Sequence, residues 1–414
     1  MPIITTASSG APTTPPVEVP GVGYASVTYI DPTGAVWPMT DRARDYYALS
    51  DGISGLGAAP VELTTDDYPR GGSRLRHAQP VSRSIVWPIH VQGDNHQEFV
   101  NTWRRLARAF TRTLREGPGV LEFARPDGGR RQIHVYYQEG FEGLGQPGTG
   151  VTWDRAVLTL YCEDPYWYDA VPRVVHREQG VGEDFFVPYP SVSSSQVLGA
   201  TTVTNPGDVV VWPEWVITGP ASSVTFTRSD SGDAFTLDPT LLGGSLLATE
   251  QVTVTTDPPR VRKQTAEVQT IDLGGATAGT ITITFDGYTT TDIAYDADAA
   301  TVQAALEALP NVDAGDITVT GGPLPATISL SFAGQYLGVD VPEVTITPTG
   351  LTGGTVTVAT TTPGATTNWV GALNWPGAVL WALEPGDNAV TFQLDGSGAG
   401  SAVDLSFHPR YETA

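Results

Sequence analysis

Apolar and polar residues alternate over short stretches along most of this chain. The clearest stretch is L-T-L-Y-C-E at residues 158–163, where leucine or cysteine occupies every second position. A period of two residues is typical of a strand with one buried face. Asp164 and Pro165 end this strand, because proline lacks an amide hydrogen and aspartate favours a local turn. Three aromatic residues follow directly, so the pattern predicts a strand that closes a domain.

The same alternation predicts many further strands. In the first part of the chain we expect them at residues 24–30, 35–39, 46–49, 61–64, 81–91, 120–123, 131–137 and 151–161. Later strands are expected at 203–204, 209–212, 213–218, 222–227, 234–237 and 251–256. Their spacing of roughly ten residues is typical of a β-sandwich. The predicted fold class is therefore mainly β.

One strong amphipathic helix interrupts the first group of strands, at about residues 95–116. Asp94 is expected to cap it, with Gln97 in the capping-box position, and Gly117-Pro118 ends it. Apolar residues recur at helical spacing, at Phe99, Trp103, Leu106, Phe110 and Leu114. This spacing predicts one face packed against a sheet.

The other faces of this helix carry five arginines, namely Arg104, Arg105, Arg108, Arg112 and Arg115. A nucleic-acid site is one interpretation. It would need aromatic side chains between the basic ones for base stacking, and the helix has none there. A solvated face or a face that pairs with another subunit is favoured.

The composition divides the chain into a flexible arm and three domains. Residues 1–20 are rich in Thr, Pro and Ser, as in a flexible N-terminal arm. We expect a first domain at 21–178 that is β-sandwich-like or barrel-like and contains the amphipathic helix. A second sandwich should comprise 179–262 and 364–414. A small β-rich, Ig-like domain at 263–363, with one short helix at 299–309 introduced by Asp298, is predicted to be inserted into it.

Charge separates the two ends of the chain. The net charge is −23 over 414 residues. Residues 1–180 carry −3 and residues 181–414 carry −20. A surface this acidic disfavours DNA binding, because contacts to DNA phosphates are made mainly by Lys and Arg. No stretch approaches the ~20 apolar residues of a membrane span, and we see no signal peptide.

Candidate chemistry is sparse. The six histidines lack metal-site spacing, the single Cys162 excludes a cysteine cluster, and neither a nucleophile elbow nor a P-loop occurs. The glycine-rich run at 143–148 lacks the helix that a dinucleotide site needs after it. We therefore expect no catalytic, cofactor-binding or metal-binding residue. Trp369, Trp375 and Trp381 could stack on sugar rings, although filling the sandwich core is favoured.

Several segments, in matching order, resemble the distal tail protein of long-tailed bacteriophages, the siphoviruses. In the first domain they are V-W-P-I-H-V-Q-G-D before the helix, F-A-R-P-D-G-G-R-R, and L-T-L-Y-C-E-D-P-Y-W-Y. In the second they are N-P-G-D-V-V-V-W-P-E-W-V-I-T-G, V-T-V-T-T-D-P-P-R and L-W-A-L-E-P-G-D-N-A-V-T-F, which resemble that family's galectin-like sandwich. The module at about 264–363 departs from the family and is similar to β-rich domains inserted in structural proteins of actinobacterial phages.

The resemblance implies a non-enzymatic hub at the distal end of the tail in the virion, made in the host cytoplasm. The first domains would form a ring, with a hexamer as the expected stoichiometry, and DNA would pass through it as cargo only. Partners would be the tail tube protein, tail-associated and baseplate hub proteins, the tape measure and the receptor-binding apparatus. On this reading Asp164, Pro165, Tyr166, Trp167 and Tyr168 are the interdomain hinge, and the five helix arginines form a subunit interface.

Two other function classes stay open. The first is a carbohydrate-binding adhesin that attaches to a host surface glycan through the sandwich or the insert, with Trp369 and Trp375 as stacking residues. The second is a glycoside hydrolase, suggested only by acidic pairs such as Glu139 with Glu142. An acidic chain produces such pairs by chance, and sequence spacing cannot place them across a cleft.

Overall fold

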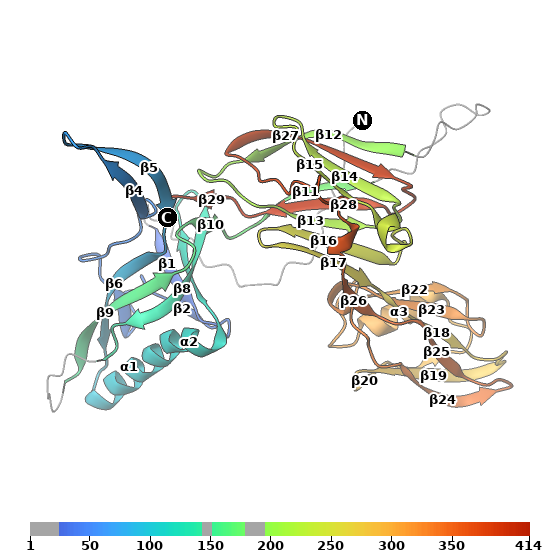
Figure 1. Ribbon diagram of the computed structural model, residues 1–414. Helices are drawn as coiled ribbons and strands as arrows, with labels where there is room; N and C mark the ends of the chain where they lie inside the picture. Colours follow the sequence, from blue (N-terminus) through green and yellow to red (C-terminus); the bar gives the residue numbers. More distant parts are fainter. Residues whose placement is uncertain (1–24, 143–150, 179–194) are drawn as a thin grey trace. The chain divides into compact units, whose positions relative to one another are not determined.

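A computed structural model describes residues 25–142, 151–178 and 195–414. The predicted arm at 1–20 and the glycine-rich run at 143–148 lie outside these ranges. The described residues are mainly β, as predicted, and fall into two compact units (Figure 1). Residues up to 172, together with 207–209 and 408–414, form the first unit; residues 173–206 and 210–407 form the second. The finer domain boundaries stay a prediction.

The first unit is built on one antiparallel sheet with the strand order β2-β1-β7-β8-β9-β6-β3. The short strand β10 adds to β8 and also pairs with β29, which is formed by the end of the chain. The strands are β1 (Ser26–Ile30), β2 (Val36–Pro38), β3 (Tyr46–Ala48), β6 (Arg83–Gln92), β7 (Gly119–Ala124), β8 (Arg130–Glu139), β9 (Trp153–Cys162), β10 (Trp167–Asp169) and β29 (Arg410–Tyr411).

The predicted helix is present as α1 (His96–Thr111) and the short α2 (Thr113–Glu116), and it packs its apolar stripe on the sheet. Phe110 is buried and stacks on Tyr29 of β1 with 4.1 Å between ring centroids. Two details of the prediction are wrong. The N-cap is Asn95, whose side chain accepts from the amide of Glu98, because Asp94 lies one residue too early. Leu114 is 61% exposed and lies on the short helix α2, beyond the end of α1 at Thr111.

A hairpin of β4 (Val61–Asp67) and β5 (Ser73–Pro80) forms a sheet of its own in the first unit. Every residue of both strands is exposed. Figure 1 shows it as a projecting pair of strands. The sequence pattern predicts a strand at 61–64, within β4, but it does not predict β5, because the apolar residues of β5 do not alternate regularly with its polar ones.

The second unit contains a two-sheet sandwich, with strand orders β11-β28-β13-β16-β17-β26 and β12-β27-β14-β15. Trp215 of one sheet lies 4.3 Å from Phe226 of the other between ring centroids, so the two sheets share a core. Trp381 is 3% exposed in this core, the role favoured from the sequence. The elements are β11 (Arg173–Glu178), β12 (Ser195–Asn205), β13 (Glu214–Thr218), β14 (Ser223–Arg228), β15 (Ala234–Leu237), β16 (Glu250–Thr256), β17 (Pro259–Thr265), β26 (Ala365–Asn368), β27 (Gly386–Asp395), β28 (Ala402–Phe407), and the 3₁₀ turns η1 (Pro239–Leu242) and η3 (Val370–Ala372).

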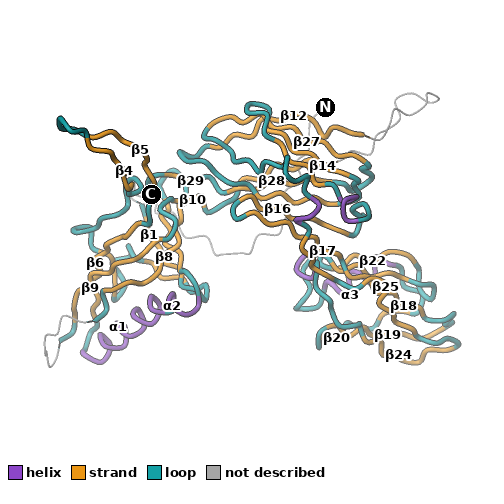
Figure 2. Tube along the Cα trace, in the orientation of Figure 1, coloured by secondary structure: helices purple, strands orange, loops and turns teal. Residues whose placement is uncertain are grey.

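Residues between β17 and β26 form two small sheets and a helix around a separate apolar core (Figure 2). The predicted short helix is α3 (Ala299–Glu307), and Asp298 caps it by accepting from the amide of Thr301. The buried Glu267 accepts from the amides of Val341 and Gly364, which holds both ends of this module together. The other elements are β18 (Glu267–Asp272), β19 (Ala278–Phe285), β20 (Tyr288–Thr289), β21 (Ile293–Ala294), β22 (Ile317–Gly321), β23 (Ile328–Phe332), β24 (Thr345–Thr352), β25 (Thr357–Thr362) and η2 (Gly334–Tyr336).

Candidate assembly surfaces

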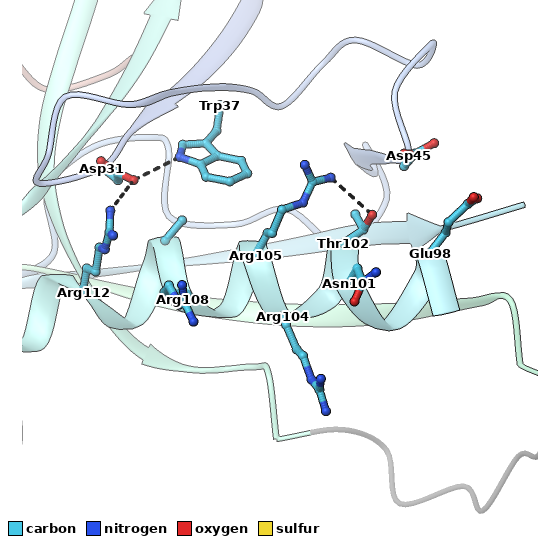
Figure 3. A pocket seen from close by; sticks show the side chains of 11 residues that line it. Asp31, Trp37, Asp45, Glu98, Asn101, Thr102, Arg104, Arg105, Arg108 and Arg112 are labelled. Atoms are coloured by element: carbon cyan, nitrogen blue, oxygen red, sulfur yellow. Dashed lines mark hydrogen bonds and ion pairs between the residues drawn. The ribbon is translucent and has the colours of Figure 1, made fainter. Parts of the chain in front are cut away.

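Four of the five predicted helix arginines line one groove of about 670 Å³. They are Arg104, Arg105, Arg108 and Arg112. Figure 3 shows Arg105 and Arg112 on the side of α1 that faces Trp37, whereas Arg104 points away from that side. Arg115 lies on α2 and does not line the groove. The helix therefore presents its arginines over a wide surface and not as a single row.

One end of the groove is closed by an ion pair. Arg112 Nη1 lies 3.5 Å from Asp31 Oδ2 and donates to Thr33 Oγ1 at 3.1 Å. Burial by itself would raise the pKa of Asp31, but hydrogen bonds from Thr33, Trp37 and Ala35 hold that pKa below its ordinary value. Arg112 thus contributes to the fold of the first unit, and a role of the five arginines in subunit pairing stays a prediction.

The predicted hinge residues belong to the first unit. Trp167 is fully buried in its core and meets Phe123 edge to face, with ring centroids 5.2 Å apart. Pro165 is also buried, whereas Asp164 is exposed. Tyr168 pairs with Gln132 of β8 and, through the other side of β10, with Arg410 of β29. The segment is thus held on both sides by strands, and its role in setting an interdomain angle stays a prediction.

The two tryptophans considered for glycan stacking lie in different surroundings. Trp369 is half-buried against the sandwich core, with Lys263 Nζ 4.7 Å from its ring centroid. Trp375 is 54% exposed. Of the pair, Trp375 has the accessibility that sugar stacking needs, and glycan binding by either residue stays a prediction.

Within the described ranges, no three His, Cys, Asp or Glu side chains gather as a metal site. No helix of these ranges is long and apolar enough to span a membrane.

The structure shows two exposed apolar surfaces that the sequence does not predict. The first is an apolar face of the β4–β5 hairpin, which is called the hairpin face below. In the register of the hairpin, Val61 lies opposite Pro80, Leu63 opposite Ala78, and Thr65 opposite Leu75. Opposite residues project to the same side of a sheet. A strict alternation on β5 would have revealed this face, but the register shifts between Thr64 and Thr65, where Arg76 is an extra residue.

The second is the outward side of β9, called the β9 face below. The buried positions of this strand pack on the core with α1, and the alternate positions point the other way. These include Trp153, Val157 and Tyr161, which are 54%, 51% and 38% exposed. The alternation of residues 151–161 indicates this face, but sequence alone does not show that nothing covers it.

The described residues thus form a mainly β, two-unit protein, and its first unit exposes apolar side chains on two β faces. No protein-family model matches this chain, and a search of curated proteins finds no match. It is similar in structure to the SPP1 Dit (gp 19.1) protein, described as a paradigm of the hub adsorption apparatus in phages that infect Gram-positive bacteria. The TM-score is 0.47 and the identity 12%, over 94% of this chain and 99% of that one.

It is also similar to a chain of the phage p2 baseplate in its activated conformation with Sr. Here the TM-score is 0.43 and the identity 7%, over 93% of this chain and 98% of that one. Because both TM-scores lie below 0.5, neither likeness says what this chain does.

Proposed function

We propose that this chain is a structural hub protein of a phage tail tip, located at the distal end of the tail in the virion. The order of the segments that resemble distal tail proteins carries this proposal. Three of them lie on the sheet of the first unit, covering β6, the β7–β8 hairpin, and β9 with β10. The other three lie along the sandwich of the second unit, at β13, the β16–β17 turn and the approach to β27. The six segments therefore lie on or next to the main strands of both units.

In this role the first unit builds a homo-oligomeric ring, a hexamer in our proposal, that continues the tail tube and lets DNA pass. Two observations support self-association by this unit. Its balance of charge is near neutral, so copies would repel one another little. It also exposes large apolar side chains on two β faces, and such patches mark interaction sites when they are contiguous.

The second unit and its inserted module would project to the baseplate proteins, the receptor-binding apparatus or the host surface. Their charge of −20 over residues 181–414 keeps such projections soluble and apart from one another. The role requires no catalytic chemistry.

Antibody labelling of phage particles tests this role. Antibodies raised against the chain and applied to particles that carry its gene should bind at the tail tip in electron micrographs. Labelling of the capsid, or of no part of the particle, would remove the proposal. Antibodies against the major capsid protein of the same particles serve as the control for access.

A carbohydrate-binding adhesin is the second candidate, and the exposed ring of Trp375 is the observation that favours it. Binding to host cell-wall glycan on an array, lost in Trp375→Ala, would support it. If the chain binds no wall glycan, the adhesin function is wrong and the structural role is the one that stays.

A further inference from the structure

A pocket of about 450 Å³ lies against β17 and β26, the two strands that connect the sandwich to the inserted module. Its volume falls in the range of about 300–1,000 Å³ that is usual for small-ligand sites. Most of the residues that line it are polar, and neither Trp369 nor Trp375 is among them. The pocket is therefore separate from the tryptophans considered for glycan stacking.

Two arginines of β17 lie on the pocket side of the sheet. Val261 is 2% exposed and belongs to the sandwich core. Arg260 and Arg262 flank it and are exposed, because successive residues of a strand point to opposite faces. Asn368 of β26 lies opposite Arg262 in the ladder, so it projects to the same side. The pocket thus lies on the outer face of this sheet, with both guanidinium groups beside it.

These two arginines differ from the other basic residues of the acidic part of the chain. Residues 181–414 contain only five basic side chains. Three of them form ion pairs, namely Lys263 with Glu250, Arg228 with Glu384 and Arg410 with Asp164. Within the part of the chain that the structure describes, Arg260 and Arg262 have no hydrogen-bond or ion-pair partner. Two neighbouring positive charges therefore stay unpaired in a region that carries −20.

The charges and the polar groups of the pocket suit an acidic sugar. A guanidinium group donates two parallel hydrogen bonds to a phosphate or a carboxylate. Residues two apart on a strand are separated by about 6–7 Å, so both arginines can reach one such group. Asn368 Oδ1 accepts from the amide of Val370 at 3.0 Å, which leaves its NH₂ group to donate. The Thr366 hydroxyl donates to the Gly338 carbonyl at 3.0 Å and can still accept from a sugar hydroxyl.

Other anionic partners fit the lining less well. None of the lining residues is aromatic, whereas single-stranded nucleic acid is held by stacking of its bases on aromatic side chains. The apolar lining consists of Pro259, Val261 and Val370, and Val261 is buried. The pocket thus offers little surface for the apolar or aromatic anchors that dominate protein interfaces. A saccharide needs neither.

We propose that this pocket binds a saccharide that carries phosphate or carboxylate groups, with one such group held between Arg260 and Arg262. At physiological ionic strength charges more than about 8 Å apart are largely screened, so the two nearby arginines outweigh the net negative charge of the chain. The site goes beyond the tail-tip role and does not depend on ring formation.

Calorimetric titration of the full chain in 0.15 M salt tests the site. The acidic probes are a phosphorylated mannose oligosaccharide and an oligogalacturonate, which distinguish phosphate from carboxylate as the bound group. Maltohexaose is the neutral probe. At least one acidic probe should bind at least about tenfold more tightly than maltohexaose. Arg260→Gln and Arg262→Gln should each weaken that binding at least about tenfold, because each removes a charged pair of hydrogen bonds.

Matched controls separate the pocket from general effects of charge. Arg173→Gln removes an exposed arginine from β11, at the opposite edge of the same sheet. Trp375→Ala removes the exposed indole that does not line the pocket. Both variants should bind the acidic probe within about threefold of the original chain. Circular dichroism should show every variant folded, and Arg262→Lys, which keeps the charge but loses the planar donor pair, should bind more weakly than the original chain.

The outcomes separate this site from the tail-tip role. Absence of binding by both acidic saccharides, or equal binding of maltohexaose, would overturn the proposal. A hexaglutamate peptide that binds as tightly, with the same dependence on Arg260 and Arg262, would overturn it in favour of an acidic protein segment. Binding that is lost in Trp375→Ala and kept in both arginine variants would also overturn it. Antibody labelling of the tail tip is independent of all these results.

Discussion

Arg410 Nη2 donates to both carboxylate oxygens of Asp164, at 2.6 Å each, across 246 positions of sequence. The guanidinium of Arg410 also lies 4.7 Å from the ring centroid of Tyr166. The end of the chain is thereby attached to the turn that follows β9. Because β29 and β10 also pair as strands, this attachment continues the sheet of the first unit.

Arg410→Ala should loosen this attachment without unfolding the unit. The pair is partly exposed, so we expect a loss of no more than about 1 kcal/mol in the free energy of unfolding. Hydrogen exchange followed by mass spectrometry should quicken in β10 and β29 and stay unchanged in β27 of the sandwich. Equal protection of β10 in both proteins would mean that strand pairing alone holds the end of the chain.

Trp167→Ala should destabilise the first unit strongly. Removing a fully buried indole costs about 3–5 kcal/mol, since the core cannot close the cavity. Chemical denaturation measures the loss, and Trp153→Ala, which truncates an exposed indole, is the matched control. If the hinge hypothesis holds, electron microscopy should also show an altered arrangement of the two units in Trp167→Ala. An unchanged arrangement would make the hinge role wrong.

The carboxylate of Asp31 makes the stability of the first unit depend on pH. Its pKa is held below the ordinary 3.8, so its contribution is complete above that value and is lost as the pH falls through the folded-state pKa. Asp31→Asn should therefore be less stable at neutral pH, with a difference that narrows below about pH 3.8. Thermal unfolding from pH 7 to pH 2.5 measures it. A difference that is constant over this range would contradict the assignment, and Asp94→Asn controls for loss of an exposed charge.

Cys162 should be inert while the protein is folded. The thiol is buried, and burial raises its pKa to about 12, so almost no thiolate exists at neutral pH. A thiol reagent such as iodoacetamide should label it only in denaturant. Labelling of the native chain at the rate of a free thiol would show that β9 opens readily.

Trp369 and Trp375 should respond differently to truncation. Trp375→Ala should leave stability within about 0.5 kcal/mol, because the ring is exposed, whereas Trp369→Ala loses packing and a cation–π contact worth about 0.5–1 kcal/mol. Thermal unfolding compares the two. If a glycan binds at this surface, only Trp375→Ala should remove binding without loss of stability.

Much of the local structure follows from the sequence alone. Alternation with a period of two residues predicts β9, and apolar residues at steps of three or four predict α1, because each spacing puts apolar side chains on a single face. The cap of α3 was also predictable, since Asp298 directly precedes the apolar positions of that helix. The N-cap of α1 is predicted one residue too early. Asp94 and Asn95 are adjacent and both suit a cap, so only the backbone geometry shows that Asn95 is the cap.

Long-range relations needed the tertiary structure. Nothing in residues 408–414 alone indicates that they pair with β10, because a strand of two residues carries no periodicity. The hairpin face depends on a register that an extra residue in β5 shifts. Trp153 and Trp167 each begin a strand, so the sequence does not distinguish them. In the structure Trp153 is exposed on β9 and Trp167 is buried on β10. Local patterns in the sequence predict which side chains share a face of a strand or helix. Whether that face is covered depends on the packing of segments that are distant in the sequence.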